Sequence, residues 1–325
     1  MTGVGLCLPQ LGEHVNADVI VQFCIEAERL GYTSLWVQDH FLWPVEPQRG
    51  YAGVAGLPIP PQYQSVLAPT ELLAVAAAVT QRARLGTSVL VQGNHWPASL
   101  AQRLATLDVL SKGRLIVGLG QGWNAEEHIA SGTSVHERAA RMEEFVQALK
   151  ACWGEDPVRF DGRLLTVPPS IQRPKPIQRP HPPLISGASS PAGRARTAAI
   201  FDGWNPAGMP VAAVAEAVSA MNATRDPARA PLRVFHRSFV QFLGPPEPFD
   251  AVIDRLTDEA TQASRAGFDE LILEHNFWDA ITTPDDWLAV PQQFLPVLEA
   301  ATSTATGTQA GEASSSSVQG QQRYS

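Results

Sequence analysis

The stretch SLWVQDHFLWP, residues 34–44, starts as a short apolar run and breaks off at Gln38, Asp39 and His40. An apolar run of this length that ends in polar residues and a proline indicates a buried β-strand. The flanking segments 18–30 and 69–81 have helical periodicity, and the second begins with a proline that suits a first helical turn. A buried strand between two helices is the repeating unit of a parallel sheet.

This alternation of strand and helix continues to residue 300. The apolar runs that we interpret as strands are Gly3–Leu8, Ser34–Gln38, Ala83–Val91, Arg114–Leu119, Pro183–Ser186, Ile200–Asn205, Leu232–Leu243 and Glu270–Leu273. The helical segments are Asp18–Leu30, Pro69–Gln81, Pro97–Leu110, His136–Trp153, Pro191–Ala199, Pro210–Met221, Pro248–Ala266 and Thr283–Ala300. Eight strand–helix units predict a (β/α)8 TIM barrel of the α/β class. A doubly wound sheet of about six strands, which alternates in the same way, is the competing fold.

The predicted barrel has insertion loops after strands two, four and five. Residues 42–64 are rich in proline and follow strand two, and residues 154–182 form a second proline-rich excursion. Loops that follow barrel strands lie on the face where active sites are built. Residues 302–325 are mostly Ser, Thr, Gly, Gln and Ala, with too little apolar content to fold. We therefore expect a barrel domain of residues 1–301 and a disordered tail of residues 302–325.

Composition excludes several classes of protein. A net charge of −8 argues against nucleic acid or an anionic membrane as the main partner. Three cysteines give neither an even disulfide framework nor a metal-binding spacing, which predicts a reduced, cytoplasmic protein without a metal site. The N-terminus lacks the pattern of a signal peptide, and no apolar run reaches the length of a membrane helix.

Candidate site residues cluster where strands end. Asp39, His40 and Trp43 follow the second strand, and a carboxylate beside an imidazole and an indole suits binding and protonation of a heteroaromatic ligand. The alternative is that Asp39 caps the turn and His40 is structural. Ser88 and the glycine before it suggest a bulge in the third strand or close approach of a ligand, although an ordinary packed strand is also possible.

The fourth strand ends in GLGQGW, with Gly120, Gly122 and Trp123. The GxGxG spacing differs from the dinucleotide motif GxGxxG, so the glycines are expected to let a flat ring lie against the backbone. The following Glu126, Glu127 and His128 are expected on a solvated helix start, and the alternative is that they are acid–base groups. After the fifth strand, Ala188, Ser189 and Ser190 lead into a helix whose N-terminus can bind phosphate, with Arg194 assisting. The alternative is that Ser190 is simply the N-cap.

Two further strands carry candidate residues. Cys7 in the first strand is expected in the core. Glu274 and His275 end the eighth strand and either line a substrate pocket or close the barrel rim.

Five segments in chain order resemble the bacterial luciferase-like monooxygenase superfamily. They are LGYTSLWVQDH, LGTSVLVQGNHWP, LATLDVLSKGRLIVGLGQGW, RPKPIQRPHPPLISGASSPAGRA and FDGW. More narrowly, they are similar to its branch of coenzyme F420-dependent oxidoreductases. The resemblance runs from Gly3 to Trp204, and more loosely to Ala300. It implies a TIM barrel that binds a flavin or 5-deazaflavin at its C-terminal face, and a homodimer.

The resemblance also implies roles for residues. A non-prolyl cis peptide is expected between Ser88 and Val89, behind the central ring of the cofactor. Asp39 matches a residue that contacts the ring, and His40 one that exchanges a proton during hydride transfer. The aromatic residue over the reactive face is near the position of Trp43, and the cofactor phosphate is held by Ala188, Ser189 and Ser190.

Two positions depart from relatives. Trp123 stands where the family's sugar-phosphate dehydrogenases carry a catalytic Glu, so that acid–base assignment does not transfer to this chain. Ala52 follows Tyr51 where relatives often have Tyr-Pro, in the variable loop that bears on substrate specificity.

The expected function is hydride transfer between C5 of F420 and a small organic substrate. The expected substrate pocket consists of Trp43, Tyr51, His95, Trp123, Glu274 and His275. The excess of Arg over Lys suggests a high-GC bacterial genome, which favours the deazaflavin. The first alternative is an FMN-dependent monooxygenase that uses oxygen and reduced flavin from a partner reductase. The second is a flavin-binding protein without turnover.

Overall fold

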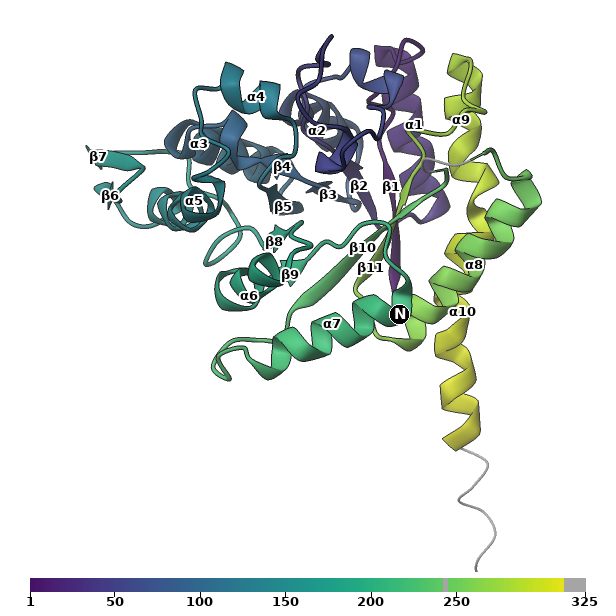
Figure 1. Ribbon diagram of the computed structural model, residues 1–325. Helices are drawn as coiled ribbons and strands as arrows, with labels where there is room; N and C mark the ends of the chain where they lie inside the picture. The colour runs from purple at the N-terminus through teal and green to yellow at the C-terminus, as the bar shows by residue number, and fades with distance from the viewer. Residues whose placement is uncertain (242–244, 313–325) are drawn as a thin grey trace, which may run out of the picture.

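The computed structural model describes residues 1–241 and 245–312, and nine of the strands there form one closed barrel surrounded by helices (Figure 1). The barrel strands are β1 Gly3–Cys7, β2 Ser34–Val37, β3 Arg84–Thr87, β4 Leu90–Val91, β5 Leu115–Gly120, β8 Leu184–Ser186, β9 Gly203–Trp204, β10 Arg233–Phe239 and β11 Glu270–Glu274. Every pairing between them is parallel. β11 pairs with β1, and β3 and β4 both pair with β5, so β3 and β4 are two halves of the third barrel strand. The predicted eight-stranded barrel is confirmed, because a doubly wound sheet would be open.

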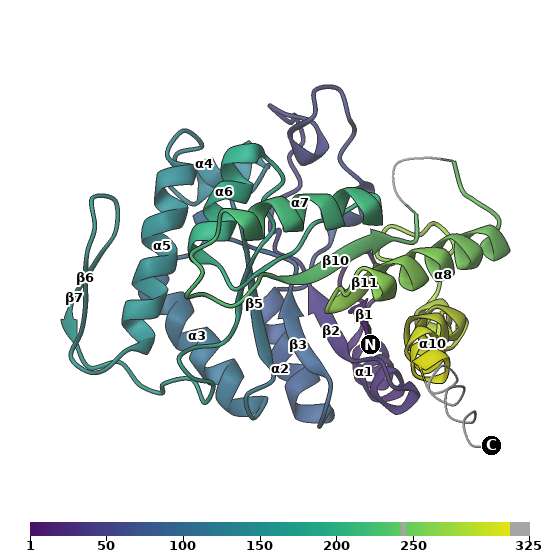
Figure 2. The ribbon, with the colours of Figure 1, turned by 90° about the horizontal axis from the view of Figure 1, so that it is seen from below.

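The helices form the outer layer, as the two views show (Figures 1 and 2). They are α1 Ala17–Leu30, α2 Pro69–Val79, α3 Pro97–Leu110, α4 Ala125–Ala130, α5 Arg138–Trp153, α6 Pro191–Ile200, α7 Val211–Ala223, α8 Phe249–Arg265, α9 Pro284–Gln293 and α10 Leu295–Glu312. The predicted helix 283–300 is therefore two helices that meet at Phe294. α10 continues past Ala301, where the tail was expected to begin, and residues 313–325 lie outside the described residues.

The insertions differ from the expectation in two places. Residues 154–182 contain an antiparallel hairpin, β6 Val158–Asp161 and β7 Thr166–Ser170, which projects from the barrel (Figure 1). This segment precedes β8, so it lies towards the N-terminal ends of the strands and away from the catalytic face. The insertion expected after strand five is absent, since only residues 187–190 separate β8 from α6. The loop 42–64 does follow β2 and contains two short 3₁₀ helices, Tyr51–Gly53 and Pro61–Gln64.

The core has two layers, because successive strand side chains point alternately into the barrel and outward against the helices. Six inward-facing residues fill the barrel: Cys7, Trp36, Ile116, Ile185, Phe235 and Ile272. Cys7 is a buried free thiol in this inner layer, as expected. Within the described residues, no helix combines the length and apolar character needed to cross a membrane.

Candidate active site

A cavity of about 550 Å³ opens at the C-terminal ends of the barrel strands. Its volume falls within the range of ligand and cofactor pockets, about 300–1,000 Å³. The predicted site residues that line it are Asp39, His40, Tyr51, Ser88, Val89, Gly120, Gly122, Trp123, Ala188, Ser189 and Ser190. Trp43, His95, Glu274 and His275 are not part of the lining.

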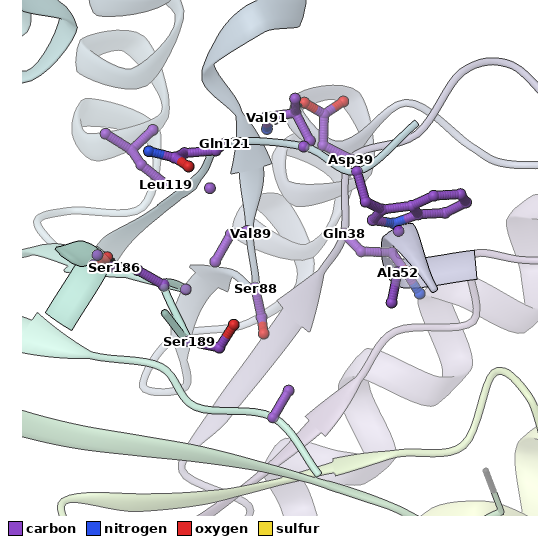
Figure 3. A pocket seen from close by; sticks show the side chains of 18 of the residues that line it. Gln38, Asp39, Ala52, Ser88, Val89, Val91, Leu119, Gln121, Ser186 and Ser189 are labelled. Atoms are coloured by element: carbon purple, nitrogen blue, oxygen red, sulfur yellow. Dashed lines mark hydrogen bonds between the residues drawn. The ribbon is translucent and has the colours of Figure 1, made fainter. Parts of the chain in front are cut away.

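The floor of the cavity is built around Val89, at the break between β3 and β4. The peptide bond between Ser88 and Val89 is cis, as the resemblance implied. Figure 3 shows Val89 pointing into the space that Ser186 and Ser189 line from one side and Asp39 from the other.

Glycines on neighbouring strands make room for Val89. A Cβ atom at Gly120 would lie 2.5 Å from a Val89 methyl carbon, and one at Gly187 would lie 3.0 Å from the other. Gly120 therefore admits Val89, whose side chain forms the apolar surface towards the cavity. A Cβ atom at Gly122 would instead lie 2.6 Å from Val91 and 3.0 Å from Nε2 of His128, and contact of either glycine with a flat ring stays a prediction.

Asp39 is a buried carboxylate at the end of β2. Its Oδ2 accepts hydrogen bonds from the backbone N–H of Val91 and from Nε2 of His95, both at 2.8 Å. His95 thus supports Asp39 from behind the cavity and does not line the substrate pocket, contrary to the expectation. These contacts hold Asp39 against β4, so the two halves of the split strand and the end of β2 form one wall.

His40 is paired with Glu127 of α4. Its Nδ1 lies 3.2 Å from both carboxylate oxygens of Glu127, and the backbone N–H groups of Phe41 and Leu42 donate to Oε1 at 2.8 and 3.3 Å. The expectation of a solvated helix start was wrong for Glu127, which is 1% exposed, and for His128, which is equally buried. The reason is that the loop after β2 folds back onto α4 and covers this turn.

Aromatic side chains form the wall beside His40. Tyr63 and Trp123 lie 4.7 and 5.2 Å from the His40 ring, and Tyr51 lies 5.1 Å from Trp123, measured between ring centroids. Burial raises the pKa of Tyr63 well above its usual value, so this phenol stays protonated. Trp43, expected over the reactive face, is 36% exposed and outside the lining, because the loop turns Tyr51 and Tyr63 inward instead.

An ion pair between Arg237 and Glu274 lies behind the floor. Arg237 lines the cavity, pairs with the fully buried Glu274, and donates from Nη1 to the carbonyl oxygen of Ser88 at 2.6 Å. Burial alone would raise the pKa of Glu274, but the Arg237 guanidinium, His275 and the hydrogen bonds from Asn276 together hold that pKa below its usual value. Glu274 therefore serves the site through Arg237 without lining the pocket itself.

His275 does not belong to the site. Adjacent strand residues point to opposite sides, so His275 faces outward from β11 and packs against Phe23 and Trp287 at ring-centroid distances of 5.6 and 5.5 Å. Burial lowers its pKa to about 4, which keeps the ring neutral. The expectation that both Glu274 and His275 contact substrate was wrong for this reason.

The opposite end of the cavity is cationic. Ser190 caps α6 by accepting from the N–H of Gly193 at 3.1 Å, and Ser189 and Ser190 both line the cavity. Arg138 and Arg196 also line the cavity, whereas Arg194 does not, and Arg196 pairs with Glu143 of α5 at 2.8 Å. A helix N-terminus flanked by hydroxyls and two guanidinium groups is suited to an anion.

Sequence reasoning did not identify four lining residues, Tyr63, Arg138, Arg196 and Arg237, and it favoured a solvated position for Glu127, which supports the site. One local signal was available for Glu127, because Asn124 is a good N-cap residue and places Glu127 at a defined position of the following turn. The others come from segments whose positions depend on tertiary structure.

Comparisons with known proteins agree with this architecture. The model of the luciferase-like monooxygenase family matches residues 4–247. An uncharacterized protein of Mycobacterium tuberculosis is 37% identical over 181 residues, which are 55% of this chain and 64% of that protein. An F420-dependent glucose-6-phosphate dehydrogenase of Amycolatopsis mediterranei is 35% identical over 147 residues, 44% of this chain and 40% of the relative. An FMNH(2)-dependent dimethylsulfone monooxygenase of Pseudomonas putida is 36% identical over 141 residues, 42% of this chain and 36% of the relative.

The matched regions thus span less than two thirds of each of these relatives. Among solved structures, a monooxygenase from Streptomyces bottropensis superposes with a TM-score of 0.67 at 21% identity, over 94% of this chain and 100% of that one. An F420-dependent secondary alcohol dehydrogenase gives 0.65 at 17% identity, over 93% and 99%. At these identities the two structures show the shared fold. The family match covers most of the barrel and all but the last strand of its catalytic face, and the chain belongs to the luciferase-like monooxygenase family.

Proposed function

We propose that this protein is an F420-dependent oxidoreductase acting on a small organic substrate. Bound in the cavity, the deazaflavin would supply or accept a hydride at C5. The observation that carries the proposal is the arrangement of the cavity: an anion site at one end, the Val89 floor in the middle, and the His40–Glu127 pair with its aromatic wall at the other.

The residues present fit such a cofactor. Val89 offers an apolar face for a flat ring, and its seat among glycines leaves the space in front of it open. Arg49, Arg138 and Arg196 all line the cavity. F420 carries carboxylates beyond its phosphate, whereas FMN ends at the phosphate, so three guanidinium groups favour the longer anion.

The chain's own residues then have defined tasks. Asp39, held by Val91 and His95, is placed beside the floor to orient the polar edge of a ring. His40 lines the cavity with its second ring nitrogen available to move a proton to or from the substrate. The rings of Tyr51, Tyr63 and Trp123 exclude water around it.

The relatives support both this proposal and one alternative. F420-dependent glucose-6-phosphate dehydrogenases are among them, but Trp123 in place of an acidic residue argues against a sugar phosphate as substrate here. The dimethylsulfone monooxygenase relative favours an FMN-dependent monooxygenase, supplied with reduced flavin by a reductase, as the second candidate. A homodimer and a cytoplasmic location are part of the proposal, and light scattering tests the first.

The proposal is tested by replacing His40. Oxidised F420 is mixed with a panel of alcohols, and reduced F420 with aldehydes and ketones, while the deazaflavin absorbance is followed without oxygen. We expect turnover with the unmodified protein and a loss of about 10²-fold or more in His40→Ala, with F420 affinity retained, since a positioned acid–base group contributes about 10²–10⁴-fold. His136→Ala, at an exposed histidine, is the matched control. Equal losses of turnover and affinity in His40→Ala would contradict the proton-transfer role.

A further inference from the structure

We infer that Glu127 is a positioning residue that selects the tautomer of His40 and so decides whether the ring nitrogen that faces the cavity, Nε2, accepts or donates a hydrogen bond. The inference deepens the proposed function and rests on it for the role of His40 in catalysis. The tautomer itself is a property of the protein without cofactor or substrate.

The geometry around Glu127 carries the inference. Both of its carboxylate oxygens lie 3.2 Å from Nδ1 of His40, and the Glu127 side chain is 1% exposed. An ionised carboxylate only accepts hydrogen bonds, so Nδ1 must carry the proton. In the neutral ring, Nε2 is then the acceptor.

The second ring nitrogen of His40 is free for chemistry. His40 lines the cavity, and its Nε2 makes no hydrogen bond to any residue of 1–241 or 245–312. Through the same part of the chain, no Lys or Arg forms an ion pair with Glu127. The carboxylate is therefore directed at His40 and at the backbone next to it.

The two oxygens of Glu127 have different partners, which makes a single substitution informative. Oε1 accepts from the N–H groups of Phe41 and Leu42 as well as from His40, whereas Oε2 has only His40 as a partner among the described residues. In Glu127→Gln, the amide oxygen would remain at the two backbone donors. The amide NH₂ would then occupy the position of Oε2 and donate to Nδ1, which forces the proton onto Nε2.

A matched control lies one residue earlier on the same helix. Glu126 accepts from the backbone N–H of Gln48 at 2.7 Å and has no contact with His40. Glu126→Gln removes the same charge from the same turn of α4. It should leave the His40 tautomer unchanged.

The experiment is ¹⁵N NMR of the histidine side chains in the full-length protein, at a mildly alkaline pH where imidazoles are neutral, with His40→Ala to assign the signal. We expect a protonated Nδ1 in the unmodified protein and in Glu126→Gln, and a protonated Nε2 in Glu127→Gln. A protonated Nε2 in the unmodified protein would overturn the inference, and this holds even if Glu127→Gln fails to fold. So would an unchanged tautomer in a folded Glu127→Gln.

A kinetic readout separates this inference from the proposed function. With whichever F420 substrate the panel identifies, Glu127→Gln should lower kcat by about 10²-fold and leave KM within about twofold, because it changes the protonation of Nε2 and leaves the cavity lining in place. Glu126→Gln should stay near the unmodified rate. If no F420 chemistry is found, the proposed function fails while the NMR result still decides the tautomer.

Discussion

β11 carries a buried glutamate at each end, and the pKa values of the two carboxyl groups are shifted in opposite directions. Glu270, at the N-terminal end of the strand, accepts from Thr33 and Ser34 and pairs with the partly exposed Arg84. Burial is the largest influence on Glu270 and raises its pKa. At Glu274 burial is again the largest influence, but Arg237, His275 and the hydrogen bonds from Asn276 together outweigh it, and the pKa is lowered.

The comparison separates the structural end of the barrel from the functional end. None of the residues around Glu270 lines the cavity, so a proton on this carboxyl group has no effect there. Glu274 keeps its charge beside Arg237, which itself contacts the carbonyl of Ser88 at the cavity floor. One strand thus stabilises the barrel at one end and holds a fixed charge pair under the site at the other.

The largest expected effect comes from removing the buried cation. Arg237→Met leaves Glu274 charged and unpaired in the barrel, which should lower the free energy of unfolding by about 3–5 kcal/mol. It should also weaken F420 binding, since the contact to Ser88 is lost. Chemical denaturation and fluorescence titration measure the two quantities.

Arg84→Met is the matched substitution at the other end. Glu270 retains two hydroxyl donors there and accepts a proton readily, so the loss should be about 1–2 kcal/mol with unchanged cofactor affinity. A larger loss for Arg84→Met than for Arg237→Met would reverse the assignment of the two ends.

His275 sharpens the contrast between the inner and outer faces of β11. Its folded-state pKa of about 4 is below the usual 6.5, so the unfolded chain takes up the proton first as pH falls. The contribution of neutral His275 to the free energy of unfolding is therefore complete above pH 6.5 and should decline by up to about 3 kcal/mol as the pH falls towards 4. His275→Phe should remove this part of the decline, measured by urea unfolding at several pH values. His236, whose pKa is also lowered to about 4 by burial, contributes with the same sign and should account for the slope that remains. An unchanged slope in His275→Phe would contradict the burial argument.

The cavity floor is tested by filling the space beside Val89. Gly120→Ala places a carbon 2.5 Å from a Val89 methyl group, and such overpacking should destabilise by about 1–3 kcal/mol. If the floor supports the cofactor ring, F420 affinity should fall as well. The double variant Gly120→Ala with Val89→Ala should recover the stability. Failure of the double variant to recover any of it would show that the two side chains do not compete for this space.

The smallest expected effect is a difference in pH slope between the two glutamates. A lowered folded-state pKa means that the contribution of Glu274 is present above about pH 4.5 and declines as pH falls below it. A raised pKa at Glu270 means that protonation favours the fold, so its contribution falls as pH rises above about 4.5. Glu274→Gln and Glu270→Gln should therefore change the slope of the free energy of unfolding against pH in opposite directions, by at most about 1.4 kcal/mol per pH unit. Changes of the same sign would contradict the comparison.

The barrel was predictable because its signals are local. Apolar runs, prolines at helix starts and glycines at helix ends mark each unit, and the predicted bounds of α3 coincide with those observed. The hairpin β6–β7 was missed because Pro168 and Pro169 make β7 read as a loop. The position of residues 154–182 was misjudged because their distance along the chain does not indicate which end of the barrel they reach.

The site was predictable where one strand end supplies the residue. Asp39 and His40 directly follow β2, and Ser88 and Val89 interrupt the third strand. Arg237 lies in the middle of β10 on its inward side, and strand period alone does not distinguish it from a residue that supports the barrel. The alternation of side chains along a strand does predict that Glu274 and His275 face opposite sides of β11, so the two cannot both face the inside of the barrel.

The identity of the cofactor is the point on which the proposed function stands. Trp123 lines the cavity, so tryptophan fluorescence reports binding when the protein is titrated in parallel with F420 and FMN. Arg49, Arg138 and Arg196 in the lining predict micromolar or tighter binding of F420 and binding of FMN weaker by about tenfold or more, a difference of about 1.4 kcal/mol. Tighter binding of FMN would contradict the proposal and make oxygen-dependent flavin chemistry the better assignment.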